Sequence, residues 1–129
     1  MTIVLTNALL QHWSKKLKKH EVVFTSANMD LSTNLDIVAS TMLPLQGSIE
    51  VQRDQAGKEH TWHTHTTDET LVIIEGGVRF YHEGGERICK KGDVINLPCG
   101  VKHGSVALEE GAIYMIAMEY IDISSFSIK

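Results

Sequence analysis

The segment Gly57–Gly76 reads GKEHTWHTHTTDETLVIIEG and holds three of the seven histidines of this 129-residue chain. Residues two apart on a β-strand point to the same face, about 6.7 Å apart along it, so His63 and His65 can present their imidazoles together. Glu69 begins the apolar run ETLVII after a short turn. A neighbouring strand can therefore bring its carboxylate back beside the two histidines.

A fourth ligand is expected from a distant part of the chain. His103, in the segment PCGVKH, follows a tight Pro98–Gly100 turn that can aim its side chain inward. Three imidazoles and one carboxylate make a mixed nitrogen and oxygen donor set that suits a borderline divalent metal. The spacing therefore predicts a metal site at His63, His65, Glu69 and His103.

Length and composition are those of one ordinary globular domain, with 43% hydrophobic and 22% charged residues. The formal net charge of −4 argues against a nucleic-acid partner, which usually requires a basic field. No apolar run approaches the roughly 20 residues that span a bilayer, and the N-terminus lacks the features of a secretory signal. The two cysteines, Cys89 and Cys99, are interpreted as free thiols, which predicts a cytoplasmic location.

Short runs of strand-forming residues follow one another from Val22 onward, separated by glycines such as Gly76–Gly77 and Gly84–Gly85, which we interpret as turns. This pattern predicts an all-β sandwich or barrel, with a hairpin turn at HEGGER, residues 82–87. The expected strands are VVFT (22–25), LDIVAST (35–41), SIEVQR (48–53), ETLVII (69–74), VRFYH (78–82), RICK (87–90), DVINLP (93–98), GSVAL (104–108) and AIYMIAMEYI (112–121).

The N-terminal residues 7–19, NALLQHWSKKLKK, have a different pattern. Leu10, Trp13 and Leu17 recur at helical spacing, and the lysines suit the C-terminal end of a helix dipole. The lysines would also suit a helix lying on a membrane surface. Because the chain as a whole is acidic, a short helix that packs its apolar stripe on the domain is the favoured interpretation.

Two blocks of the chain resemble the motifs of the cupins, which are small jelly-roll β-barrels. The first block matches through Gly57, His63, His65, Glu69 and Gly76, and the second through Gly92, Pro98, Gly100 and His103. The second motif usually ends in asparagine, where this chain has Ala107. The resemblance implies one cupin domain over residues 1–129, with a core barrel at about 35–120 and a short N-terminal helix. It also implies one divalent metal bound by His63, His65, Glu69 and His103.

Other candidate residues have simpler explanations. We expect four histidines to be ordinary core or surface residues, namely His12, His20, His60 and His82. Asp68 and Glu75 are expected in turns, and Cys99 is expected to be inert, although it could be a reactive thiol at the site mouth. Arg53 and Gln55 are expected to be solvated; the alternative is that they bind an anionic ligand inside the barrel.

Four protein ligands on a six-coordinate metal leave two positions for water, substrate or dioxygen, and this favours manganese, iron or nickel over zinc. The residues expected on the ligand face are apolar, namely Leu71, Ile73, Val78 and Phe80. They predict a small, partly apolar ligand that chelates through oxygen. Cupin lyases acting on sulfonium compounds often carry a tyrosine where this chain has Leu71, which counts against that subgroup.

Two functions stay open on the sequence. The first is a metal-dependent enzyme, a dioxygenase, isomerase, lyase or hydrolase acting on a small oxygenated metabolite. The alternative is a non-catalytic metal-dependent protein that binds or senses a small molecule. In either case we expect a homodimer, because the terminal strand-forming segment needs a cover for its outer face.

Overall fold

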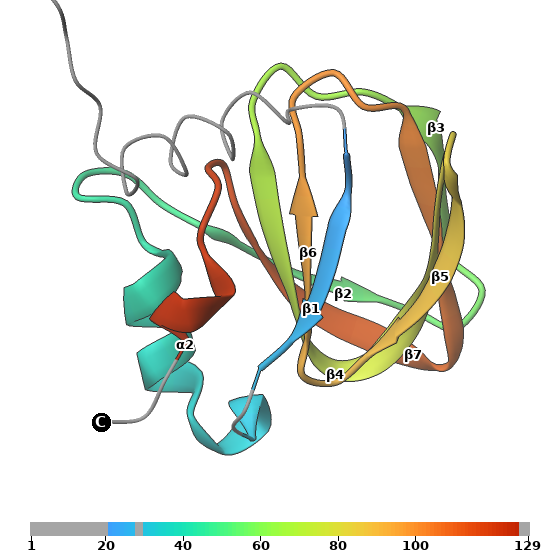
Figure 1. The fold of residues 1–129 in the computed structure, drawn as a ribbon. Coiled ribbons are helices and arrows are strands. Elements are labelled where there is room, and N and C mark those ends of the chain that lie inside the picture. The colour runs from blue at the N-terminus through green and yellow to red at the C-terminus, as the bar shows by residue number, and fades with distance from the viewer. Residues whose placement is uncertain (1–20, 28–29, 127–129) are drawn as a thin grey trace, which may run out of the picture.

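The computed structural model describes residues 21–27 and 30–126, and the expected helix at residues 7–19 lies outside them. The described part is mostly β, with short helical segments (Figure 1). Its elements are β1 (Val23–Ser26), η1 (Leu31–Thr33), α2 (Leu35–Met42), β2 (Glu50–Asp54), β3 (Glu59–His63), β4 (Glu69–His82), β5 (Gly85–Lys90), β6 (Asp93–Leu97), β7 (His103–Ala117) and η2 (Ile123–Ser125). None of the helices in this part is long and apolar enough to cross a bilayer.

The seven strands of the described part form one antiparallel sheet with the order β1-β6-β4-β7-β2. In addition, β3 pairs with β7 and β5 pairs with β4. The long strands β4 and β7 therefore run through both halves of the sheet, β4 pairing first with β6 and then with β5. The sheet is strongly curved, but its hydrogen bonding does not close into a complete barrel (Figure 1).

The long strands bend at glycines that the sequence had suggested were breaks. Gly76 lies inside β4 with a φ of 65°, and Gly111 lies inside β7 with a φ of 74°. A Cβ added at Gly76 would overlap the carbonyl of Gly111. At this point β4 and β7 therefore lie closer together than a residue with a side chain would allow. The predicted turn at Gly76–Gly77 was wrong. Glu75 accordingly lies in a bulged part of β4, exposed to solvent, and not in a turn.

The run LDIVAST, predicted as a strand, forms the helix α2. Val38 and Met42 lie one helical turn apart and are fully buried, while Asp36 sits in the first turn, where the helix dipole favours an acid. Tertiary burial of this stripe outweighs the strand preference of the β-branched residues. The hairpin predicted at HEGGER is confirmed, because His82 of β4 pairs with Gly85 of β5.

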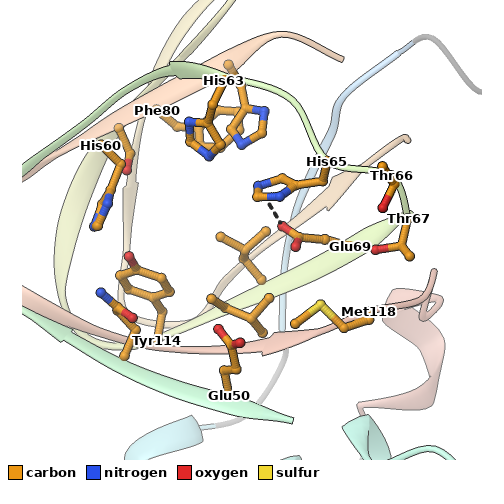
Figure 2. A pocket seen from close by; sticks show the side chains of 15 residues that line it. Glu50, His60, His63, His65, Thr66, Thr67, Glu69, Phe80, Tyr114 and Met118 are labelled. Carbon is orange, nitrogen blue, oxygen red and sulfur yellow. Dashed lines mark ion pairs between the residues drawn. The ribbon is translucent and has the colours of Figure 1, made fainter. Parts of the chain in front are cut away.

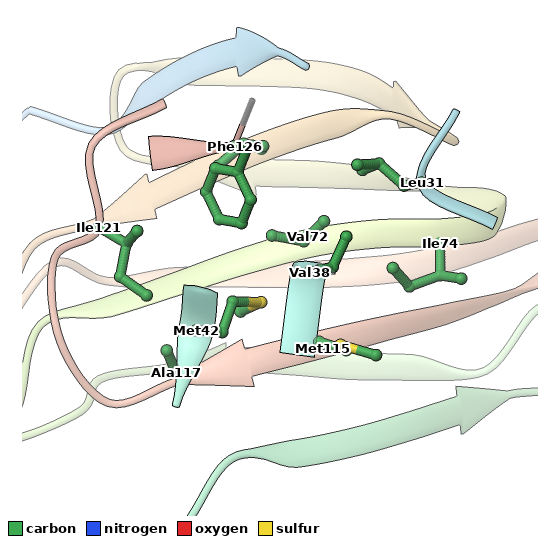
Figure 3. Close-up of a cluster of buried hydrophobic side chains, with 10 residues drawn as sticks. Leu31, Val38, Met42, Val72, Ile74, Met115, Ala117, Ile121 and Phe126 are labelled. Atoms are coloured by element: carbon green, nitrogen blue, oxygen red, sulfur yellow. The ribbon is translucent and has the colours of Figure 1, made fainter. Parts of the chain in front are cut away.

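Around the first half of β4, the side chains on both faces of the sheet are buried. We call the two groups of buried side chains the outer cluster and the inner cluster. The outer cluster, beneath α2, contains Leu31, Val38, Met42, Val72, Ile74, Val94, Met115, Ala117, Ile121 and Phe126 (Figure 3). The inner cluster lies inside the curled sheet and contains Ile73, Val78, Phe80, Cys89, Ile95, Leu97, Ala107, Ala112 and Tyr114. Successive residues of β4 alternate between these clusters, as a half-turn per residue requires.

Candidate metal site

Three predicted ligands meet inside the curled sheet. His63 ends β3 and pairs directly with His103, which begins β7, and His65 follows in the loop after β3. One candidate ligand atom of each lies within 4.8 Å of those of the other two. Figure 2 shows His63 and His65 turned toward one interior space. The structure thus brings together residues that lie 38 to 40 positions apart in the sequence.

Backbone carbonyls fix the orientation of two of these rings. The Nδ1 atom of His63 lies 2.6 Å from the Thr61 carbonyl oxygen, and that of His103 lies 2.9 Å from the Val101 carbonyl oxygen. A carbonyl can only accept, so each Nδ1 carries the hydrogen and each Nε2 keeps its lone pair. Metal-binding histidines are commonly oriented in this way. The ring of Phe80 stacks on that of His103 with a centroid separation of 5.5 Å.

Glu69, the fourth predicted ligand, lies beside this group of three. Its side chain is buried at the start of β4, with Oε1 3.5 Å from Nε2 of His65. Burial, and next the negative charge of Glu50, raise the pKa of Glu69 to about 7. The carboxyl group therefore occupies a place where negative charge is poorly stabilised by the surrounding protein.

Two of the three histidines, His65 and His103, are held in the neutral form. Burial lowers the pKa of His103 to about 4, although the hydrogen bond to Val101 opposes this change. Burial and the neighbouring His63 also lower the pKa of His65, while Glu50 acts in the opposite direction. Neutral imidazole is the form that binds metal, so these side chains need no deprotonation at neutral pH.

The spacing of these donors fits a single divalent ion after a small inward movement. Nitrogen and oxygen ligands lie about 2.1 Å from a first-row metal, so opposite ligands are about 4.2 Å apart. The 4.8 Å limit for the histidines slightly exceeds that separation, while the 3.5 Å between His65 and Glu69 falls within it. Imidazole and carboxylate are the donors expected for manganese, iron, nickel or zinc.

Direct hydrogen bonds join the loop between β3 and β4 to the loop between β6 and β7. Oδ1 of Asp68 accepts from the backbone N–H of Cys99 at 2.8 Å, and the N–H of Gly100 donates to the His65 carbonyl at 3.0 Å. Asp68 is therefore a turn residue, as expected, whose side chain also ties the loops together. At Ala107, where asparagine was expected, only backbone atoms bond to the Gly57 loop, so this contact does not depend on the missing side chain.

A cavity of about 480 Å³ adjoins the histidines. It is lined by Glu50, Gln52, His60, His63, His65, Thr66, Thr67, Glu69, Leu71, Phe80, His103, Ser105, Tyr114, Ile116 and Met118 (Figure 2). Of the four apolar residues predicted on this face, Leu71 and Phe80 line the cavity. Ile73 and Val78 lie in the inner cluster on the same side of the sheet, together with Phe80, but they do not line the cavity. Arg53 and Gln55 are exposed, which confirms their interpretation as solvated.

A buried polar group behind the cavity wall was not predicted from the sequence. Asp54 accepts hydrogen bonds from Gln52 at 2.9 Å and from Tyr114 at 2.7 Å, and its Oδ2 lies 2.9 Å from Nε2 of His60. His60 had been interpreted as an ordinary core or surface residue. The available signal was the alternation in EVQRD, which places Gln52 and Asp54 on one face. Only the pairing of β2 with β7 decides which face is internal.

Comparisons with known proteins identify the fold. The family model described as Cupin domain matches residues 50–119, while no curated protein matches the chain. A DUF861 family protein from Thermotoga maritima is 21% identical, with a TM-score of 0.52, and the alignment covers 76% of this chain and 99% of that one.

Two solved enzymes are also similar over part of their length. The DMSP lyase DddQ from Ruegeria pomeroyi is 25% identical, with a TM-score of 0.50 over 53% of this chain and 35% of that chain. A salicylate 1,2-dioxygenase from Pseudoaminobacter salicylatoxidans, solved with gentisate, is 20% identical with a TM-score of 0.50. That alignment covers 54% of this chain and 19% of the dioxygenase. At this identity the likeness to the dioxygenase shows the shared fold alone.

Proposed function

The chain belongs to the cupin family, and we propose that it is a metal-dependent enzyme acting on a small oxygenated molecule inside a jelly-roll barrel. The proposed ligands of one divalent transition metal are His63, His65, Glu69 and His103. The observation that carries this proposal is the convergence of three imidazoles, two of which are oriented by backbone carbonyls. A carboxyl group whose pKa is raised to about 7 by burial lies beside them and would gain a counter-charge from a cation.

A divalent ion held there supplies a Lewis acid for an oxygen atom of the substrate, or, as iron, a site for dioxygen. The protein would orient the reacting end of the substrate against the histidines. Leu71 and Phe80 give that end an apolar surface that limits access of water. Four protein ligands would leave two positions on a six-coordinate ion, which supports manganese, iron or nickel over zinc.

The reaction class remains one of four: dioxygenase, isomerase, lyase or hydrolase. The similarity to a solved DMSP lyase favours a lyase. Against this, Leu71 lines the cavity two residues after Glu69, and a leucine cannot transfer a proton as a tyrosine can. The proposal therefore extends to oxygen-chelating substrates in general and not to sulfonium compounds in particular.

The proposal is tested by metal content and turnover together. Elemental analysis of protein from cells grown without added metal should find one divalent ion per chain. The loaded protein is then screened with β-dicarbonyls, α-hydroxyketones, uronates and phenolic acids while oxygen uptake is recorded. Turnover that disappears in Glu69→Gln and His103→Ala, but survives in Asp93→Asn outside the cavity, supports an enzyme. Saturable binding without turnover supports the alternative of a binding or sensing protein, and protein without metal contradicts the site.

We further propose that the protein is a cytoplasmic homodimer whose partner molecules are small ligands and not nucleic acids or membranes. Support for a dimer comes from β2, which ends the main strand order of the sheet and carries Val51 with 63% of its side chain exposed. Light scattering should report about twice the 14.4 kDa of one chain. A monomer at micromolar concentration would contradict the dimer.

A further inference from the structure

The carboxylate of Asp54, which is only 4% exposed, lies behind one wall of the cavity, where it contacts the lining residues Gln52, His60 and Tyr114. Burial alone would raise the pKa of Asp54, but hydrogen bonds from Gln52, Tyr114 and His60 lower it below its usual value. The side chain is therefore ionised at neutral pH and can only accept. Burial also raises the pKa of Tyr114, so its hydroxyl stays protonated and donates to Asp54.

This arrangement determines where His60 carries its hydrogen. Nε2 of His60 lies 2.9 Å from Oδ2 of Asp54, and two acceptors cannot share a hydrogen bond, so Nε2 is protonated. In the neutral ring, Nδ1 then has a free lone pair. No hydrogen-bond partner of Nδ1 is present among the described residues, and the side chain is 31% exposed where it lines the cavity. His60 therefore offers an acceptor to whatever occupies this part of the cavity.

The charge of the cavity restricts which chemical group of a ligand can bind beside His60. Among the residues that the structure describes, the lining includes the acids Glu50 and Glu69 but neither lysine nor arginine, and Asp54 adds a negative charge behind His60. A carboxylate or phosphate reaching this wall would meet acceptors and negative charge without a compensating cation. A neutral hydroxyl could instead donate directly to Nδ1.

The position of His60 suits the far end of a chelated ligand. His60 precedes His63 by three residues on β3, at most about 10 Å along the strand, and an irregularity between the two residues lets both of them line the cavity. Figure 2 shows His60 on the wall near Tyr114, away from His65 and Glu69. A molecule about the size of one sugar or aromatic ring can bridge that gap when its chelating oxygens face the three histidines.

We propose that His60 is a specificity-determining residue, accepting a hydrogen bond from a neutral hydroxyl group at the end of the ligand remote from the metal. This inference rests on the proposed function, because the metal anchors the other end of the ligand. Asp54 acts as a positioning residue that keeps the hydrogen on Nε2. The favoured ligands are therefore neutral hydroxylated chelators and not dicarboxylates or phosphate esters.

Three hydroxypyranones test this recognition directly. Kojic acid, allomaltol and comenic acid share one hydroxyketone chelate and differ across the ring, where they carry a hydroxymethyl, a methyl and a carboxylate group. Calorimetric titration of zinc-loaded protein at pH 8 should give kojic acid an affinity about fivefold above that of allomaltol, as expected for one net hydrogen bond. Comenic acid should bind more weakly than allomaltol. Equal affinities for kojic acid and allomaltol would overturn the inference.

Variants assign the preference to His60. In His60→Gln the amide can still donate to Asp54, but the acceptor at the Nδ1 position is lost, so kojic acid and allomaltol should bind equally. In Asp54→Asn the new amide can donate to Nε2, which moves the ring hydrogen to Nδ1 and should also remove the preference. Asp93→Asn is the matched control, because Asp93 bonds Ser26 and Lys90 outside the cavity. A preference that survives in His60→Gln contradicts the inference.

A spectroscopic readout separates this inference from the metal site. The ring-nitrogen resonances of His60 in metal-free protein at pH 8 should report hydrogen on Nε2 and a lone pair on Nδ1. Hydrogen on Nδ1 would overturn the assignment even if metal binds normally. If elemental analysis finds no metal, the proposed function fails. The inference is then kept only if kojic acid, and not allomaltol, shifts the Nδ1 resonance.

Discussion

The first half of β4 faces two different interiors. Val72 and Ile74 enter the outer cluster, which α2 and the C-terminal segment cover with apolar side chains (Figure 3). Leu71 lies on the other face and lines a cavity whose polar residues include histidines, acids and Tyr114. Alternation along one strand thus separates a densely packed face, which contributes stability, from a hollow face that can carry chemistry. Substitutions on the two faces should therefore have separable effects.

The largest effect on stability is expected in the outer cluster. Met42 is fully buried on α2, and Met42→Ala should lower the free energy of unfolding by about 3 kcal/mol, because it leaves a cavity under the helix. Metal content should not change, since the site lies on the other face. Urea denaturation measures the loss. Leu43→Ala is the control, because Leu43 is 45% exposed and its truncation should cost less than about 0.5 kcal/mol.

At His103 we expect the opposite pattern, with a large effect on metal binding and a small effect on stability. His103→Ala should lower metal affinity by more than about a hundredfold, since the loss of a residue that only orients a metal ligand already costs about 10- to 100-fold. In metal-free protein the substitution should cost far less stability than Met42→Ala, because it removes a ring that burial keeps neutral. Competition with a chromogenic chelator gives the affinity. Equal metal binding by the variant and the wild type would remove His103 from the ligand set.

The free energy of unfolding of the metal-free protein should depend on pH through Glu69, which lies on the cavity face of β4. Glu69 has a pKa raised from 4.5 to about 7, so the folded protein binds this proton more tightly than the unfolded chain does. The stabilisation is complete below pH 4.5 and is lost as the pH rises through 7. The expected loss is about 2 kcal/mol, within the roughly 3 kcal/mol that such a shift represents.

Urea denaturation between pH 5 and 8 should show this loss as the difference between the wild type and Glu69→Gln, because the lowered pKa values of His65 and His103 add an opposite slope to both proteins. Added divalent metal should remove this loss in the wild type, because a cation favours the ionised carboxylate. If the stability of the wild type relative to Glu69→Gln rose over the same interval, Glu69 could not be a carboxyl group that folding protonates.

The sequence predicted the strands and the approach of the three histidines better than it predicted the bends. His63, His65 and Glu69 follow local spacing rules, and His103 was found through its motif, so their approach could be anticipated. The continuity of β4 and β7 through Gly76 and Gly111 could not, because glycine signals a turn and a bulge equally well. The helix α2 was missed because its residues favour strands locally, and only the outer cluster gives them a reason to form a helix.

The polar wall was missed for a related reason. Asp54 and His60 lie on different strands, and each looks like an ordinary surface residue in the sequence. Their contact depends on the pairing of both β2 and β3 with β7. Ligands from a compact motif are therefore predictable, whereas a pair formed by strand register is not.

The smallest effect is expected for the two cysteines, one of which lies in the buried interior and the other at the mouth of the candidate site. Cys89 is 1% exposed in the inner cluster, and burial raises the pKa of its thiol to about 12. Cys99 is exposed in the loop after β6, with Sγ 3.7 Å from the His65 carbonyl oxygen.

A thiol-disulfide reagent at pH 8 should therefore label one thiol in the native protein and two in urea. Cys99→Ser should abolish the native reaction and change the free energy of unfolding by less than about 0.5 kcal/mol. Rapid native labelling in that variant would mean that Cys89 is accessible to the reagent and that the inner cluster opens readily in the folded protein.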